Sequence, residues 1–252
     1  MNKPVQIRQV AFIMLQSQLT WTLWYIGILV IINIARLIFR ADGIDTFYNH
    51  AFVASNVYML VIGIVVISFM PYFVEMGVTR KNYFYGNTIA SLCLSILIPV
   101  FAYVLTIFEK LILGNFKEPN FNIESAADGN FIGDLLQSIL ITPYVDVETN
   151  ILLSLAVFSL NIFAFYLIGW LIGAAFYRLG VIGGILFIAI GIVLIAAKDS
   201  MQRIAMDLPL FETYASFFGA VSSNIAYILL VVVMLIPLIL IRTLTKRAPI
   251  KI

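Results

Sequence analysis

Histidine and cysteine are almost absent from this sequence, which holds one of each, His50 and Cys93. A lone cysteine excludes an intramolecular disulfide. A lone histidine, at the end of an apolar run, cannot supply a histidine metal cluster or a serine–histidine pair. The motifs H-E-x-x-H, G-x-S-x-G and G-x-x-x-x-G-K-[ST] are also missing. We therefore expect no catalytic residue in this chain, and no bound metal, ATP or other cofactor.

Charged residues are scarce as well, at 11% of 252 residues, whereas 62% are hydrophobic and the mean hydropathy is +1.04. Soluble domains have about 25% charged residues, so most of this chain must be surrounded by lipid. A helix needs roughly 20 apolar residues to cross the hydrocarbon, and no barrel-like alternation is present. The sequence predicts an all-α polytopic fold with six transmembrane helices, at 19–39, 51–73, 88–108, 151–177, 180–197 and 224–241.

The centres of these six runs carry no charged side chain. Transporters coupled to protons or ions usually place ionisable groups at mid-bilayer, so a secondary transporter is disfavoured and the energy for transport must come from elsewhere. Only Arg178 and Leu179 separate the fourth run from the fifth, which predicts a tight antiparallel hairpin.

Lysine and arginine are distributed unevenly between the loops. If the N-terminus is cytoplasmic, the cytoplasmic segments hold nine of the 15 basic residues and the outer segments hold six. The positive-inside rule then places both termini in the cytoplasm of a multi-pass protein of the cell membrane. The extracellular segments in this topology are 109–150 and 198–223.

Residues 1–18 are predicted to form an interfacial amphipathic helix ahead of the six-helix domain, 19–252. An apolar stripe recurs there at helical spacing, and polar residues fall elsewhere on the same helix. A plain extension of the first span is the alternative, because Phe12 and Ile13 interrupt the polar face. The stripe consists of Ile7, Val10, Ala11, Met14 and Leu15.

The loop between the second and third spans, which begins at Glu75, mixes charge with aromatic residues. One interpretation is a solvated turn with interfacial aromatics; the other is a docking element for a soluble partner. Its segment Gly77-Val78-Thr79-Arg80-Lys81-Asn82-Tyr83-Phe84 resembles the first coupling helix of type-2 ABC exporter permeases from Gram-positive bacteria. The exit of the fourth span, from Gly169 to Gly180, is similar to the same family. A narrower resemblance is to exporters of cytolytic amphipathic peptides, such as phenol-soluble modulins.

The resemblance implies partners and site residues. Permeases of this family pair with a second permease copy or homologue and with cytoplasmic ATP-binding subunits, which bind the ATP and Mg²⁺. Membrane lipids are further partners, and no nucleic acid is expected. The residues implied to couple to the ATPase are Glu75, Met76, Gly77, Val78, Thr79, Arg80 and Lys81, with Arg80 or Lys81 contacting acidic groups.

A translocation path is hypothesised along the first and fifth spans, where polar residues and glycines lie in otherwise apolar helices. Asn33 and Arg36 are the polar candidates; Gly180, Gly184 and Gly191 are the glycines that allow close approach of a partner helix. Hydrogen bonding within the bundle, snorkelling of Arg36 and packing within one subunit are the alternatives.

The sequence thus predicts the membrane subunit of an ATP-driven exporter of amphipathic peptides, lipid-like or drug-like molecules, dimeric across the bilayer. A non-transporting membrane scaffold or an immunity protein that sequesters a peptide is the rival interpretation.

Overall fold

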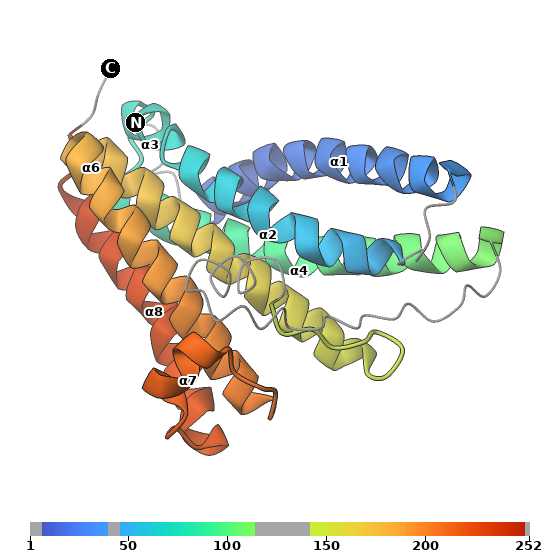
Figure 1. Ribbon diagram of the computed structural model, residues 1–252. Helices are drawn as coiled ribbons and strands as arrows, with labels where there is room; N and C mark the ends of the chain where they lie inside the picture. Colours follow the sequence, from blue (N-terminus) through green and yellow to red (C-terminus); the bar gives the residue numbers. More distant parts are fainter. Residues whose placement is uncertain (1–6, 40–45, 114–141, 250–252) are drawn as a thin grey trace.

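The computed structural model describes residues 7–39, 46–113 and 142–249, and within them it contains helices but no strand. Five stretches are long and apolar enough to cross a membrane, which confirms the predicted all-α membrane fold. They are α1 (Ile7–Phe39), α2 (Phe47–Val66) with its continuation α3 (Phe69–Glu75), α4 (Arg80–Leu113), α6 (Ile151–Ala205) and α8 (Ser223–Lys246) (Figure 1). A short helix, α7 (Glu212–Phe218), lies between α6 and α8.

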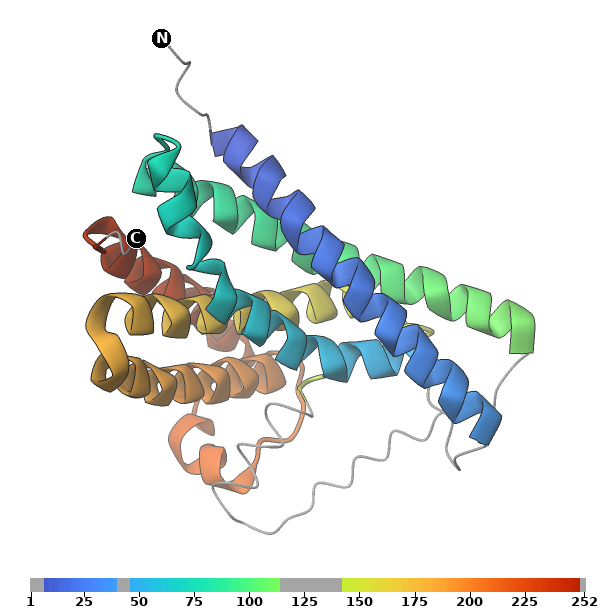
Figure 2. The same ribbon diagram turned by 90° about the horizontal axis from the view of Figure 1, so that it is seen from above.

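The longest helix, α6, doubles back on itself, so the five stretches give the six predicted spans (Figure 2). The reversal is at Gly180, whose φ of 74° and ψ of −163° are readily adopted only by glycine. The two arms then pack antiparallel: Gly184 lies against Phe176, and Gly191 against Ile168. The hairpin predicted from the short Arg178–Leu179 connection is confirmed. Its second arm is longer than the predicted span, because the helix continues to Ala205.

Proline explains the break between α2 and α3. Pro71 has no N–H for the carbonyl of Ile67, and its ring would clash with that carbonyl in a regular helix. The chain instead makes tighter bonds there, from Met70 N to Ile67 O at 3.1 Å and from Ser68 N to Val65 O at 3.0 Å. Pro99 and Pro237, by contrast, lie inside the continuous helices α4 and α8.

The tightest helix pair is α2 with the first arm of α6, where backbone meets backbone. A methyl group added at Gly169 would overlap with the carbonyl oxygen of Leu60, and one at Gly173 with that of Ile64. On the facing helix, a methyl group at Gly63 would overlap with the carbonyl oxygen of Tyr166. Glycines let membrane helices approach this closely, so Gly169 and Gly173 are used for packing within one chain.

The two ends of the bundle are defined by hydrogen bonds between helix termini. At the Glu109 end, Glu109 Oε1 accepts from Asn33 Nδ2 at 2.7 Å and Oε2 accepts from the backbone N–H of Phe47 at 2.8 Å, which joins α4, α1 and α2. At the Gly180 end, Arg178 Nη1 donates to the carbonyls of Thr243 at 2.5 Å and Leu244 at 3.1 Å. The turn between α3 and α4 also lies at the Gly180 end, because Arg80 reaches the carbonyl of Lys246.

The described part of the predicted amphipathic helix is continuous with the first span. The single helix α1 runs from Ile7 to Phe39, as in the alternative that the sequence left open. Its stripe faces protein rather than lipid: Val10, Ala11 and Met14 are buried, and Val10 fills the space left by Gly86 of α4. An apolar stripe on a helix can be covered by lipid or by a neighbouring helix, so the pattern alone does not distinguish the two. Residues 1–6, and most of the predicted outer segment 109–150, lie outside the described residues.

The close contact between α2 and α6 predicts that a side chain added at Gly169 destabilises the protein. Gly169→Ala should lower the free energy of unfolding by about 1–3 kcal/mol, because the new methyl group forces two backbones apart. Gly27→Ala is the matched control: no atom lies within 4 Å of the added carbon, and alanine favours a helix by about 1 kcal/mol. Thermal unfolding of both variants in the same detergent measures the difference. Equal midpoints would contradict the role given to Gly169.

Candidate functional site

The turn that contains the proposed coupling residues is held by regular backbone hydrogen bonds. Helix α3 ends with Val78 N donating to Phe73 O and Gly77 N donating to Val74 O, both at 2.9 Å. Gly77 has φ +81°, the left-handed conformation that this helix-ending motif requires. The turn is therefore defined by its own hydrogen bonds and needs no partner to form.

Helix α4 starts immediately after this turn. Thr79 caps it, because its Oγ1 accepts from Asn82 N at 3.1 Å. Val78 is buried, whereas the residues on either side of it, Gly77 and Thr79, are exposed. The solvent-facing surface of the turn consists of Glu75, Met76, Gly77, Thr79 and Lys81.

The two basic residues of the turn have different environments. Arg80 is half-buried and its Nη1 donates to the carbonyl of Lys246 at 3.4 Å. Together with Arg178, it places positive charge at the C-terminal carbonyls of α8, where a helix favours cations. Lys81 is exposed. Of the two residues implied to contact acidic groups, Lys81 is the one that is available.

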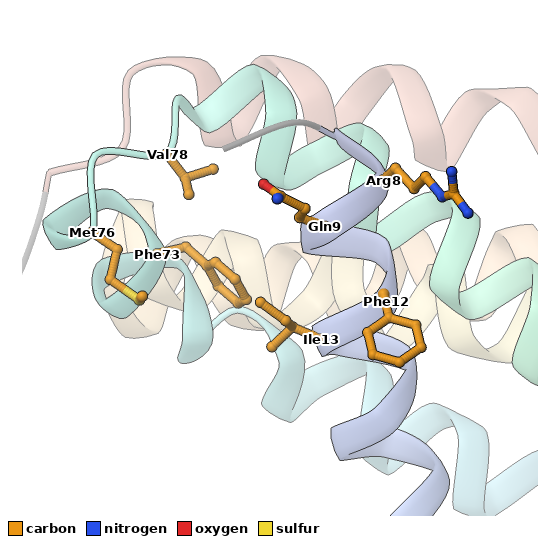
Figure 3. A pocket seen from close by; sticks show the side chains of 7 residues that line it. All are labelled: Arg8, Gln9, Phe12, Ile13, Phe73, Met76 and Val78. Carbon is orange, nitrogen blue, oxygen red and sulfur yellow. The ribbon is translucent and has the colours of Figure 1, made fainter. Parts of the chain in front are cut away.

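A groove of about 730 Å³ lies beside this turn. One wall comes from the start of α1 and the other from α3 and the turn. Figure 3 shows Gln9 and Ile13 of α1 pointing towards the side of Phe73, Met76 and Val78. The turn and the start of α1 therefore form one surface at the Gly180 end. The groove is lined by Arg8, Gln9, Phe12, Ile13, Phe73, Met76 and Val78.

The residues of the hypothesised translocation path are not brought together within the chain. Asn33 and Arg36 lie at the Glu109 end, where they bond to Glu109 and His50. Gly180 and Gly184 lie at the opposite end, since Gly180 forms the reversal of α6. Gly184 and Gly191 face the first arm of α6. Neither glycine is therefore open to a partner helix on the face that packs against that arm.

Buried charges in the second arm of α6 were missed from the sequence. Lys198 and Asp199 are 2% and 0% exposed, although both fall in the segment predicted to be an outer loop. Lys198 Nζ donates to Asn161 Oδ1 on the first arm, and Arg203 Nε donates to Asp199 Oδ2 at 2.7 Å. The sequence feature that could have revealed this buried pair is the i, i+4 spacing of Asp199 and Arg203, which places opposite charges on one helix face.

A second buried polar cluster links three helices near the Gly180 end. Gln18 Nε2 donates to Asn87 Oδ1 and to the hydroxyl of Tyr166, both at 3.0 Å, and that hydroxyl donates to Asn87 Oδ1 at 2.9 Å. All three side chains are fully buried. Gln18 Oε1 and Asn87 Nδ2 have no partner among the described residues, but the three bonds that are made join α1, α4 and α6 and favour one register between them.

Comparison with known proteins gives no relative: no family model, no curated protein and no solved structure matches this chain.

The contact between Lys198 and Asn161 predicts that substitutions of these two residues have non-additive effects on stability. Asn161→Leu should destabilise by about 1–3 kcal/mol, because it removes the amide that solvates a buried ammonium group. Lys198→Met added to it should recover part of that loss. Lys110→Met is the control, because Lys110 forms an exposed ion pair with Glu148 that contributes about 0–1 kcal/mol. Unfolding midpoints of the single and double variants provide the test; strictly additive effects would rule out the coupling.

Proposed function

We propose that this chain is the membrane subunit of an ATP-driven exporter, which moves amphipathic peptides, lipid-like or drug-like molecules out of the cell. It would act with a second membrane subunit and with cytoplasmic ATP-binding subunits that hold the ATP and Mg²⁺. The observation that carries the proposal is the hydrogen-bonded turn at residues 75–81. This turn has an exposed lysine and lies beside a groove at the Gly180 end.

The geometry of the turn supports transmission of force. Helix α4 begins directly at Arg80 and α3 ends directly at Glu75, so a push on the turn acts on two helices at once. Helix α3 follows α2, which is packed backbone to backbone on α6. A partner that binds this turn therefore acts on the most closely packed helix pair of the chain.

The charge of the Gly180 end supports a cytoplasmic position for the turn. Among the described residues of this end, Glu75 is the single acid against seven bases, and an excess of basic residues is typical of cytoplasmic loops. The bases are Arg8, Arg80, Lys81, Arg178, Arg242, Lys246 and Arg247.

The buried charges of α6 favour one competing function, secondary transport. Secondary transport was disfavoured because the centres of the predicted spans carry no charge. Lys198 and Asp199 weaken that argument, because they are ionisable groups buried within a long apolar helix. A secondary transporter would need no ATPase, and neither would a scaffold or immunity protein. Purification from native membranes separates the proposed function from all three alternatives.

Charge reversal at the exposed lysine tests the proposed docking. Lys81→Glu should reduce association with the ATP-binding subunit at least about tenfold, because it places like charges opposite each other. Arg247→Glu is the matched control, since Arg247 is an exposed base at the same end. The readout is the ATP-binding subunit recovered with the tagged chain, together with ATP hydrolysis stimulated by an amphipathic peptide.

Two outcomes would contradict the proposal. One is a chain purified from native membranes with no ATP-binding subunit attached. The other is full association and stimulated hydrolysis in Lys81→Glu, which would leave residues 75–81 as an ordinary turn.

A further inference from the structure

A small cavity lies between α1 and α2 at the Glu109 end, on the side of the bundle away from the proposed docking turn. It has a volume of about 260 Å³. This is slightly below the range of about 300–1,000 Å³ typical of sites that enclose a whole small molecule. The cavity is lined by Leu29, Ile32, Asn33, Arg36, His50, Val53 and Ala54.

Two of its lining residues, Arg36 and His50, are hydrogen-bonded to each other. Arg36 Nη1 lies 2.7 Å from His50 Nδ1. An arginine can only donate, so Nδ1 must accept and the hydrogen of the neutral ring must be on Nε2. The Nε2 atom is buried and has no hydrogen-bond partner among the described residues. A buried donor of this kind is costly unless water or a ligand accepts its hydrogen.

The positive charge of Arg36 has no carboxylate partner in the described part of the chain, where the ion pairs are Lys110–Glu148 and Asp199–Arg203. Two acids of this end are engaged elsewhere: Glu109 by Asn33 and the backbone N–H of Phe47, and Glu148 by Lys110. Arg36 donates through one nitrogen to a neutral histidine, which leaves the other N–H groups of its guanidinium for an acceptor. Among the described residues that line the cavity, Arg36 therefore supplies a positive charge that no acid offsets.

The other lining residues of the cavity, apart from Asn33, are apolar, and one of them lies on the outer surface of the bundle. Helix α1 packs mainly on α4 and only sparsely on α2, and Ile32 at the cavity is 50% exposed. The apolar lining consists of Leu29, Ile32, Val53 and Ala54. A ligand can thus place a polar group in the cavity and leave a hydrocarbon chain in the bilayer.

Hydroxyl groups continue along the same face of α1 towards the centre of the bundle. Tyr25 bonds to Ser55 at 3.0 Å, and Thr22 bonds to Tyr58 at 2.9 Å. Positions 22, 25, 29, 33 and 36 follow helical spacing on one face. The seam between α1 and α2 therefore offers polar contacts from the middle of the bundle to the cavity.

We propose that this cavity binds the anionic head group of an amphiphile, a carboxylate or a phosphate, while its chain remains in the bilayer. Arg36 is the donor, and His50 holds its guanidinium group in place. That the bound amphiphile is the substrate of an exporter rests on the proposed function. Binding itself requires neither ATP nor a partner subunit. A failure of binding is therefore distinct from a failure of the ATPase association.

Photo-crosslinking of the full chain in phosphatidylcholine nanodiscs tests the proposal. The probe is palmitate with a diazirine beside the carboxylate, and its methyl ester is the neutral control. The acid should label residues 29–36 and 50–54 at least about tenfold more than the ester does, the effect expected for a charge-assisted hydrogen bond. Equal labelling by acid and ester in the unmodified chain would overturn the proposal.

Variants test whether Arg36 causes the preference for the acid over the ester. Arg36→Gln should remove the preference for the acid and Arg36→Lys should keep part of it. Lys110→Gln, which removes an exposed cation at the same end, should leave it unchanged. Loss of the preference in Lys110→Gln, or its survival in a folded Arg36→Gln, would refute the assignment. If Arg36→Gln does not fold, the comparison of acid with ester still decides.

A competition arm distinguishes the two sources of the anionic group. Phosphatidylglycerol added to the nanodiscs should displace the probe if a lipid head group is the occupant. Undiminished labelling of the cavity would identify a free amphiphile instead. Both results support an anionic site.

Discussion

Close contact between the backbones of α2 and α6 is the constraint on which the rest of the structure depends. Gly63, Gly169 and Gly173 remove the side chains that would separate these helices. In lipid the hydrophobic effect does not drive helices together, so van der Waals packing and polar contacts must do so. Contact at this distance places Tyr166 of α6 within reach of Gln18 and Asn87, and it aligns the start of α6 with Tyr48, whose hydroxyl accepts from Ser154 Oγ at 2.9 Å.

Polar groups then fix the remaining helices around this pair. Glu109 joins α1, α2 and α4 at one end, and Arg178 holds the last carbonyls of α8 at the other. Between these ends, α1 rests on α4 rather than on α2, which leaves a seam with the cavity at Arg36. In the proposed exporter, the tightly packed α2–α6 pair would receive the motion of the turn at residues 75–81. The loosely packed seam would be the part that admits an amphiphile.

Much of this fold follows from the sequence, because apolar length and glycine conformation act locally. The six spans and the hairpin at Gly180 were predictable, whereas the break between α2 and α3 falls inside the span predicted at 51–73. The environment of Lys198 was not, because a charge at the end of an apolar run resembles the start of an outer loop until its partner, Asn161, is known. Likewise, an apolar stripe such as Val10 and Met14 does not reveal whether lipid or α4 covers it. The separation of Asn33 from Gly184 depends on the direction in which each helix runs, which single-residue patterns do not give.

The central claim is that the turn at residues 75–81 faces the cytoplasm and the Glu109 end faces outward. Thiol labelling from the outside tests it most directly, with Cys93 replaced and single cysteines placed at the exposed positions Lys81 and Glu148. The account predicts that a membrane-impermeant maleimide labels position 148 in intact cells and position 81 only after the cells are permeabilised. Labelling of position 81 in intact cells would contradict it, because no cytoplasmic ATPase could then reach the turn.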